Sequence, residues 1–101
     1  MAVEPLARKE IEDQLSELPG WSLDGDRLVC SYRLAHHFAA TAMVVHIAQV
    51  QEELNHHSDL TLGYNTVSVA VSTHSAGGKV TRLDIELARR ITALAPVHGA
   101  R

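Results

Sequence analysis

The chain has 101 residues, of which 46% are hydrophobic and 21% charged, a balance that suits a single globular domain spanning residues 1–101. Its formal charge of -3, from 9 basic and 12 acidic residues, gives no electrostatic footprint for nucleic acid and no polybasic stretch for a membrane surface. With one cysteine, no apolar leader and no run of about 20 apolar residues, the sequence predicts a cytoplasmic protein without a membrane span.

A short amphipathic helix is predicted near the N-terminus. Ile11, Leu15 and Leu18 recur at i, i+4 and i+7 with charged residues between them, which is the spacing of one helical face. Pro19-Gly20 ends the pattern, because neither residue continues a helix well.

A β-hairpin is predicted next. Asp24-Gly25 is a hairpin turn signal, and it separates Trp21-Ser22-Leu23 from a longer run between Arg27 and Leu34. Alternate residues of that longer run should face the core. They are Leu28, Cys30, Tyr32 and Leu34.

The segment from His36 to about His56 contains neither glycine nor proline and predicts a long helix. It carries two apolar stripes on nearly opposite sides: one is Met43, Ile47, Val50 and Leu54, and the other is Phe38, Ala42 and Val45. A helix that is apolar on two sides needs a cover on each. The second stripe has two candidate covers, another copy of the chain or the N-terminal helix, and the first of these would make the protein an oligomer.

A second strand pair is predicted from Leu60 to Tyr64 and from Val67 to His74, with Asn65-Thr66 as the turn. In the later strand three valines alternate with polar or small residues, so the two sets should face opposite sides of the sheet. His74 then ends this strand on its polar face.

The last helix is predicted to begin after Thr81, an N-cap residue, with Asp84 three residues later completing a variant capping box. Its apolar face is Leu83, Leu87, Ile91 and Leu94. The predicted order is thus α-β-β-α-β-β-α. Two hairpins joined by a helix indicate an α+β fold, with a four-stranded antiparallel sheet and helices packed on one face.

Three histidines are the candidate chemical groups: His56 and His57 are adjacent at the end of the long helix, and His74 ends a strand. Imidazole titrates near neutral pH, so it can donate and accept protons without an extreme pKa shift. Glu52 lies four residues before His56, and a continuing helix would place both on one face. Judged alone, an adjacent histidine pair at a helix end is more often a surface feature than a site.

Other chemistries have less support. Zinc needs three or four ligands, and His56 and His57 cannot both reach one ion from a regular helix, so we expect no metal site. Cys30 falls in the predicted core of a strand, where a thiol is usually inert. Asp84 is explained by its position in the first turn of a helix.

Several short motifs together resemble the pterin-4a-carbinolamine dehydratase family, over residues from about 11 to 95. The matching runs are Leu18-Pro19-Gly20-Trp21, Glu52 with Leu54-Asn55-His56-His57, Tyr64-Asn65 with Val67, Ser72-Thr73-His74, Gly77-Gly78, and Asp84 before Leu87-Ala88. Each run is weakly specific, but their order and spacing are specific. The family usually has proline after the two histidines, where this chain has Ser58, and an aromatic residue two positions later, where it has Leu60.

The resemblance implies a 4a-hydroxytetrahydrobiopterin dehydratase, a hydro-lyase that converts 4a-hydroxytetrahydropterin to quinonoid dihydropterin and water without metal or other cofactor. It implies that the catalytic residues are His56, His57 and His74, and that Glu52, Ser72, Thr73, Asp84 and Trp21 help to bind the substrate. The expected partner is a small-molecule pterin, and the expected assembly is a homodimer or homotetramer. The alternative is a non-catalytic oligomeric binding module, because some animal relatives also act as dimerisation cofactors for a homeodomain transcription factor.

Overall fold

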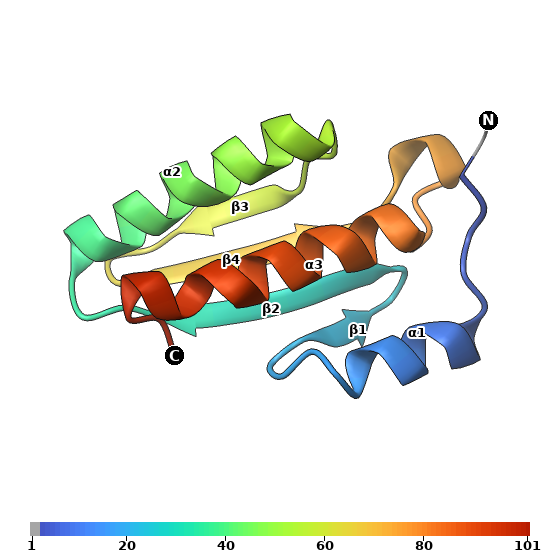
Figure 1. The fold of residues 1–101 in the computed structure, drawn as a ribbon, viewed down its shortest axis with the longest axis horizontal. Helices are drawn as coiled ribbons and strands as arrows, with labels where there is room; N and C mark the ends of the chain where they lie inside the picture. The colour runs from blue at the N-terminus through green and yellow to red at the C-terminus, as the bar shows by residue number, and fades with distance from the viewer. Residues whose placement is uncertain (1–2) are drawn as a thin grey trace.

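The computed structural model describes residues 3–101, and Figure 1 shows them folded as helices over a four-stranded antiparallel sheet. In chain order the elements are α1 (Arg8–Leu15), β1 (Ser22–Asp24), β2 (Arg27–Arg33), α2 (His37–Leu54), β3 (Asp59–Leu62), β4 (Thr66–Val71) and α3 (Arg82–Leu94). Short 3-10 turns, η1 (His74–Ala76) and η2 (Ala95–His98), precede and follow α3. The element order and the α+β class expected from the sequence are confirmed.

The strands lie in the order β1-β2-β4-β3, so β2 and β4 pair at the centre of the sheet. The pairing is antiparallel and places Cys30 opposite Val69. Because successive side chains of a strand point to opposite faces, alternate residues of both strands are buried. The buried residues are Leu28, Cys30 and Tyr32 of β2 and Val67, Val69 and Val71 of β4. The core-facing residues predicted for β2 are therefore confirmed, and so is the prediction that the three valines of β4 share one face.

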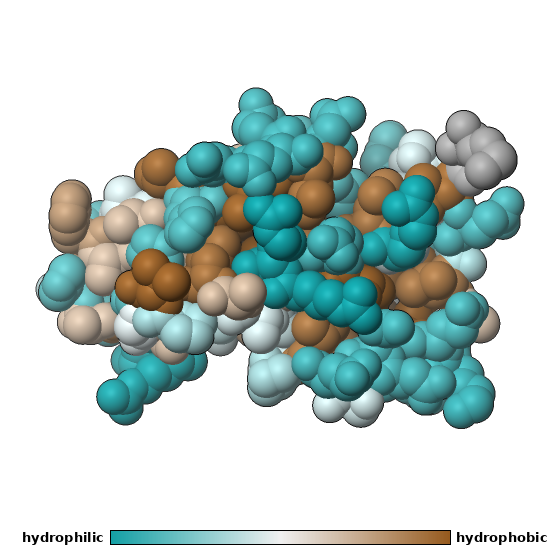
Figure 2. All heavy atoms as spheres, in the orientation of Figure 1, coloured by the Kyte–Doolittle hydropathy of each residue, from teal (hydrophilic) through white to brown (hydrophobic). Residues whose placement is uncertain are grey.

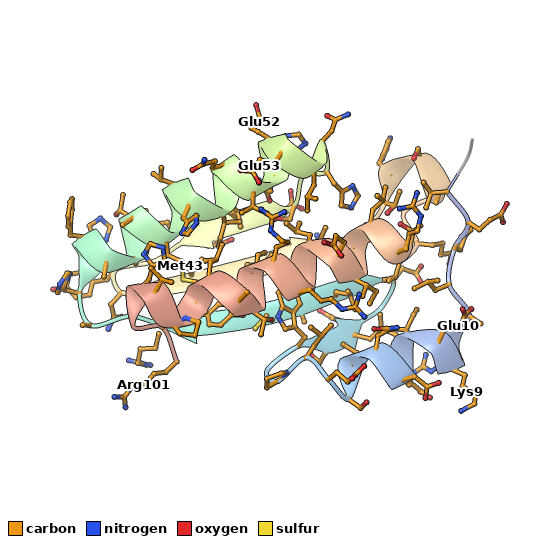
Figure 3. All side chains as sticks on the ribbon, viewed as in Figure 1. Lys9, Glu10, Met43, Glu52, Glu53 and Arg101 are labelled. Carbon is orange, nitrogen blue, oxygen red and sulfur yellow. The ribbon has the colours of Figure 1, made fainter. Side chains whose placement is uncertain are left out.

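The core lies between this face of the sheet and helices α2 and α3, which run side by side over it (Figure 1). Met43 and Ile47 of α2 and Leu87 and Ile91 of α3 have no exposed surface. Each large apolar side chain buried in this way contributes roughly 1.5–3 kcal/mol to stability. Figure 3 shows Met43 between the two helices, whereas Glu52 extends from the outer side of α2.

The second apolar stripe of α2 is uncovered within the chain. Phe38 and Val45 of this stripe are 78% and 65% exposed. Helix α1 lies beside β1, on the far side of α3 from α2 (Figure 1), and buries Ile11 there. Of the two candidate covers for the second stripe, the N-terminal helix is therefore excluded.

The surface over the helices is mixed. Hydrophilic side chains cover much of this face, and apolar residues show between them (Figure 2). None of the helices within residues 3–101 combines the length and the apolar character needed to cross a membrane.

Candidate active site

The two adjacent histidines follow the end of α2. The helix ends at Leu54 rather than continuing to His56, because Asn55 adopts a left-handed conformation with φ 51° and ψ 43°. The chain turns sharply there, and the N–H of His56 donates to the carbonyl of Gln51 at 3.0 Å. As a result His56 points into the protein and is 8% exposed, whereas the side chain of His57 is 55% exposed.

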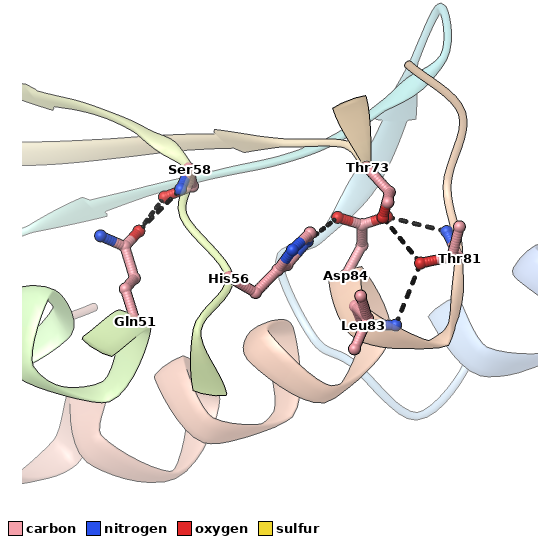
Figure 4. Close-up of polar contacts among 7 residues, drawn as sticks. All are labelled: Gln51, His56, Ser58, Thr73, Thr81, Leu83 and Asp84. Carbon is pink, nitrogen blue, oxygen red and sulfur yellow. Dashed lines mark hydrogen bonds and ion pairs between the residues drawn. The ribbon is translucent and has the colours of Figure 1, made fainter. Parts of the chain in front are cut away.

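His56 joins a buried polar network at the start of α3 (Figure 4). Its Nε2 lies 2.6 Å from Oδ1 of Asp84, whose other oxygen accepts from the Thr73 hydroxyl and the Thr81 backbone N–H, both at 2.8 Å. The Thr81 hydroxyl lies 2.7 Å from that of Thr73 and accepts from the N–H of Leu83. An ionised carboxylate only accepts, so His56 donates from Nε2. Asp84 thus completes the capping box of α3 and holds the His56 ring at the same time.

A cavity of about 280 Å³ lies beside this network, on the side of His57. Its lining residues are Arg27, His57, Ser58, Asp59, Ala70, Ser72 and His74. His57 reaches it from the loop between α2 and β3. His74 reaches it from η1, because β4 ends at Val71, before the strand end predicted from the sequence. The fold therefore brings two imidazoles from separate elements to one cavity.

Six of the eight predicted site residues fall into two adjoining groups. The cavity group is His57, Ser72 and His74, and the buried group is His56, Thr73 and Asp84. The groups adjoin because each contains a chain neighbour of the other. His56 of the buried group precedes His57 of the cavity group, and Thr73 of the buried group lies between Ser72 and His74 of the cavity group. The third predicted catalytic residue, His56, is not among the residues that line the cavity.

Glu52 contacts His57 rather than His56. Its Oε2 lies 2.6 Å from Nε2 of His57. The expectation that Glu52 and His56 share one helical face is wrong, because α2 ends first and Asn55 turns His56 toward the interior. Since a carboxylate accepts, His57 donates from Nε2, which leaves Nδ1 able to accept a proton.

Trp21 belongs to the core and does not line the cavity. It is 6% exposed, and its Nε1 donates to Oγ1 of Thr92 on α3 at 3.0 Å. A buried tryptophan usually satisfies its N–H in this way. The ring therefore joins the segment before β1 to α3.

Ser58 anchors the loop that carries His57 through two hydrogen bonds. Its backbone N–H donates to Oε1 of Gln51 at 2.9 Å, and its hydroxyl donates to the same atom. Gln51 is buried on α2. The close-up shows both contacts (Figure 4).

Arg27 and Asp59 are cavity residues that the sequence analysis did not identify. Nη1 of Arg27 lies 3.0 Å from Oδ2 of Asp59. The available signal was a pair of opposite charges, Arg27 at the start of one predicted strand and Asp59 just before the start of another. That signal becomes informative only once the strand order is known, because β2 and β3 lie on either side of β4.

The cavity is equipped for proton transfer. Two imidazoles that face one space can donate and accept protons near neutral pH, and a carboxylate orients one of them. Within residues 3–101, no three or more side chains of the types His, Cys, Asp and Glu are grouped so as to hold a metal ion.

Comparisons with known proteins cover almost the whole chain. A family model described as pterin 4 alpha carbinolamine dehydratase matches residues 4–94. A protein of Streptomyces avermitilis provisionally named pterin-4-alpha-carbinolamine dehydratase is 74% identical over 99% of each chain, and one of Streptomyces coelicolor with the same name is 68% identical over the same share. The crystal structure of a transcriptional coactivator/pterin dehydratase from Brucella melitensis has a TM-score of 0.84 at 33% identity, covering 90% of this chain and 98% of the other.

Proposed function

Because the chain belongs to the pterin-4-alpha-carbinolamine dehydratase family, a family of hydro-lyases, we propose that it dehydrates a 4a-hydroxytetrahydropterin in the cavity of His57 and His74. In this reaction the C4a–O bond breaks, N5 loses its proton and a C4a=N5 double bond forms, which yields quinonoid dihydropterin and water. The step needs an acid at the leaving oxygen and a base at N5. The observation that carries the proposal is the meeting of two imidazoles at one cavity.

The surroundings of the two rings favour different roles. Glu52 accepts from Nε2 of His57, so Nδ1 of that ring is the atom available to remove the N5 proton. A carboxylate behind an imidazole also stabilises the cation that forms when the ring takes up a proton. His74 is then the acid that protonates the leaving hydroxyl.

His56 acts in this scheme as a positioning residue. Asp84 holds the His56 ring, and His56 is the chain neighbour of His57. The buried network therefore fixes the position of the backbone that carries the His57 ring. Thr73 donates to the same carboxylate and lies between two cavity residues, Ser72 and His74. The buried group therefore fixes both sides of the cavity.

The size of the cavity supports a substrate that places one flat heterocycle in it. A volume of about 280 Å³ lies just below the usual range for ligand cavities, which begins at about 300 Å³. The hydroxyls of Ser58 and Ser72 and the Asp59 carboxylate supply polar groups at its wall. A pterin ring carries several nitrogen and oxygen atoms that pair with such groups.

The test is stopped-flow dehydration of a 4a-hydroxytetrahydropterin. His57→Ala and His74→Ala should each lower kcat by about 10²-fold or more, the usual contribution of a general acid or base. His37→Ala, at the opposite end of α2, is the matched control and should keep the wild-type rate. Wild-type rates in either cavity variant would refute these roles, and a wild type no faster than the uncatalysed reaction would refute the activity itself.

His56 has a separate test, because a positioning role predicts a particular kinetic pattern. His56→Asn retains a donor for Asp84 and should keep more of kcat than His56→Ala, with KM changed less than kcat in both. Equal kcat losses in the two variants would contradict positioning through Asp84.

We also propose a homodimer or homotetramer assembled through the second apolar stripe of α2. Its support is the exposure of Phe38 and Val45, which an apolar contact between copies would cover. Phe38→Glu with Val45→Glu should give monomers by sedimentation. An unchanged mass would refute assembly through this stripe.

A non-catalytic binding module is the second candidate function. It is favoured by the same uncovered stripe and by the name of the Brucella melitensis protein, which includes transcriptional coactivator. A binding module requires no reaction at the cavity. The dehydration rate of the wild-type protein therefore separates the two candidates.

A further inference from the structure

An ion pair crosses the open face of the sheet beside the cavity. Arg27 begins β2 and Asp59 begins β3, with β4 lying between these strands. Ala70 of β4 is paired with both Val29 and Asp59, so its small side chain lies beneath the crossing. Nη1 of Arg27 reaches Oδ2 of Asp59 at 3.0 Å over this alanine.

The ion pair stands between two hollows. Arg27, Asp59 and Ala70 line the 280 Å³ cavity, and they also line a second hollow of about 510 Å³ over the open face of the sheet. We name this second hollow the sheet trough. Because the two share three wall residues, they adjoin at the ion pair.

Hydroxyl groups dominate the polar lining of the sheet trough. They belong to Ser22, Ser31, Thr61 and Ser68, and those of Ser31 and Ser68 lie 2.9 Å apart. The charge of Arg27 is balanced by Asp59. A hydroxyl both donates and accepts, so this lining suits an uncharged, hydroxyl-rich chain better than an anionic one.

The chemistry of the proposed substrate directs one substituent toward this trough. The reacting atoms are C4a and N5, which must face His57 and His74, and C6 is bonded directly to N5. A substituent on C6 therefore starts next to the reacting edge and has to leave the cavity close to it. Arg27, Asp59 and Ala70 form the boundary that it must cross to reach the trough.

We propose that the sheet trough is a subsite for the C6 substituent, and that the protein prefers 4a-hydroxytetrahydropterins whose C6 substituent is extended, uncharged and polyhydroxylated. This inference rests on the proposed function. The substituent crosses from the cavity to the trough at the ion pair. There the Arg27 guanidinium donates hydrogen bonds to its hydroxyls, and the Asp59 carboxylate accepts hydrogen bonds from them. Both side chains are substantially exposed, 47% and 83%, so their ion pair contributes little stability and a ligand can open it.

The first experiment compares three 4a-hydroxytetrahydropterins that differ only at C6: methyl, tetrahydroxybutyl, and an anionic aminobenzoylglutamate chain. We expect kcat/KM for the tetrahydroxybutyl substrate to exceed the other two by about tenfold, through KM, which corresponds to one or two added hydrogen bonds. Equal values for the methyl and tetrahydroxybutyl substrates would overturn the inference. So would a preference for the anionic chain.

Variants locate the preference. Arg27→Met and the double variant Ser31→Ala with Ser68→Ala should each reduce the ratio of kcat/KM, tetrahydroxybutyl over methyl, to near one. Ser16→Ala, which removes a hydroxyl from the end of α1, is the matched control and should keep the ratio. A ratio unchanged in the trough variants would overturn the subsite.

A binding measurement separates this inference from the proposed function. Unreactive 7,8-dihydropterins with the same C6 groups can be titrated by fluorescence whether or not the protein is catalytic. Tighter binding of the tetrahydroxybutyl compound that is lost in Arg27→Met would support the trough even if no dehydration were detected. Equal affinities in wild type and variant would refute the trough while leaving a measured dehydration rate intact.

Discussion

Replacing Ser58 by proline, the residue that the family usually has at this position, should destabilise this protein. Ser58 donates two hydrogen bonds to Oε1 of Gln51, one from its backbone N–H and one from its hydroxyl. Proline has neither donor. Gln51 is only 5% exposed, so water has little access to replace them.

The size of the effect follows from two opposing terms. A buried acceptor left without a partner costs about 1–3 kcal/mol. A proline that suits the backbone stabilises by about 0.4–1 kcal/mol, because it restricts the unfolded chain. Ser58→Pro should therefore lower the free energy of unfolding by roughly 1–2 kcal/mol. In a Gln51→Leu background no acceptor is orphaned, and the same proline should be neutral or stabilising.

Urea unfolding of the four proteins in this double-mutant cycle measures the coupling, provided that the m-values agree. Ser58→Ala is the matched control, because it removes the hydroxyl but keeps the N–H bond, so its loss should be smaller. If Ser58→Pro is as stable as wild type, or if proline costs the same in both backgrounds, the anchoring role of Gln51 is refuted.

Three further outcomes are expected. Asp84→Asn should lower the free energy of unfolding by about 1–3 kcal/mol in urea, because its buried oxygens lose charge-assisted hydrogen bonds; an unchanged value would contradict the network. Burial and the neighbouring His46 lower the pKa of His98, so the unfolded chain binds a proton more readily than the folded one. The free energy of unfolding of the wild type, compared with that of His98→Asn, should thus be highest at pH values above the unfolded pKa, about 6.5, and should fall as the pH drops below it. Thermal unfolding of both proteins between pH 5 and 8 checks this. Burial raises the pKa of the Cys30 thiol, so iodoacetamide at pH 7.5 should label the native protein far more slowly than the urea-unfolded one; equal rates would refute this burial.

Local patterns in the sequence were enough to predict most of the fold. The alternation of Leu28, Cys30 and Tyr32 placed these residues in the core, because a pleated strand sends successive side chains to opposite faces. Thr81 and Asp84 form the capping box predicted from their spacing of three. These features depend on residues close together in the chain, so their spacing alone identifies them.

The direction of each histidine was not predictable in the same way. The sequence placed His56 and His57 together, but which ring faces the interior depends on the left-handed turn at Asn55. That turn moved Glu52 from the predicted neighbour, His56, to His57. A single change of backbone conformation at a helix end changes the direction of the side chains that follow. The spacing of residues in the sequence does not predict such a change.

The sequence by itself determined the strands, the long two-sided helix and the family resemblance, because each is written in local periodicity or in ordered motifs. Only the tertiary structure decided that His57 and His74 meet at one cavity while His56 is held behind it by Asp84. It also decided that Arg27 and Asp59 meet across β4. These contacts join residues from 17 to 32 positions apart, and they exist because the hydrophobic core fixes the strand order and the packing of α3 against the sheet.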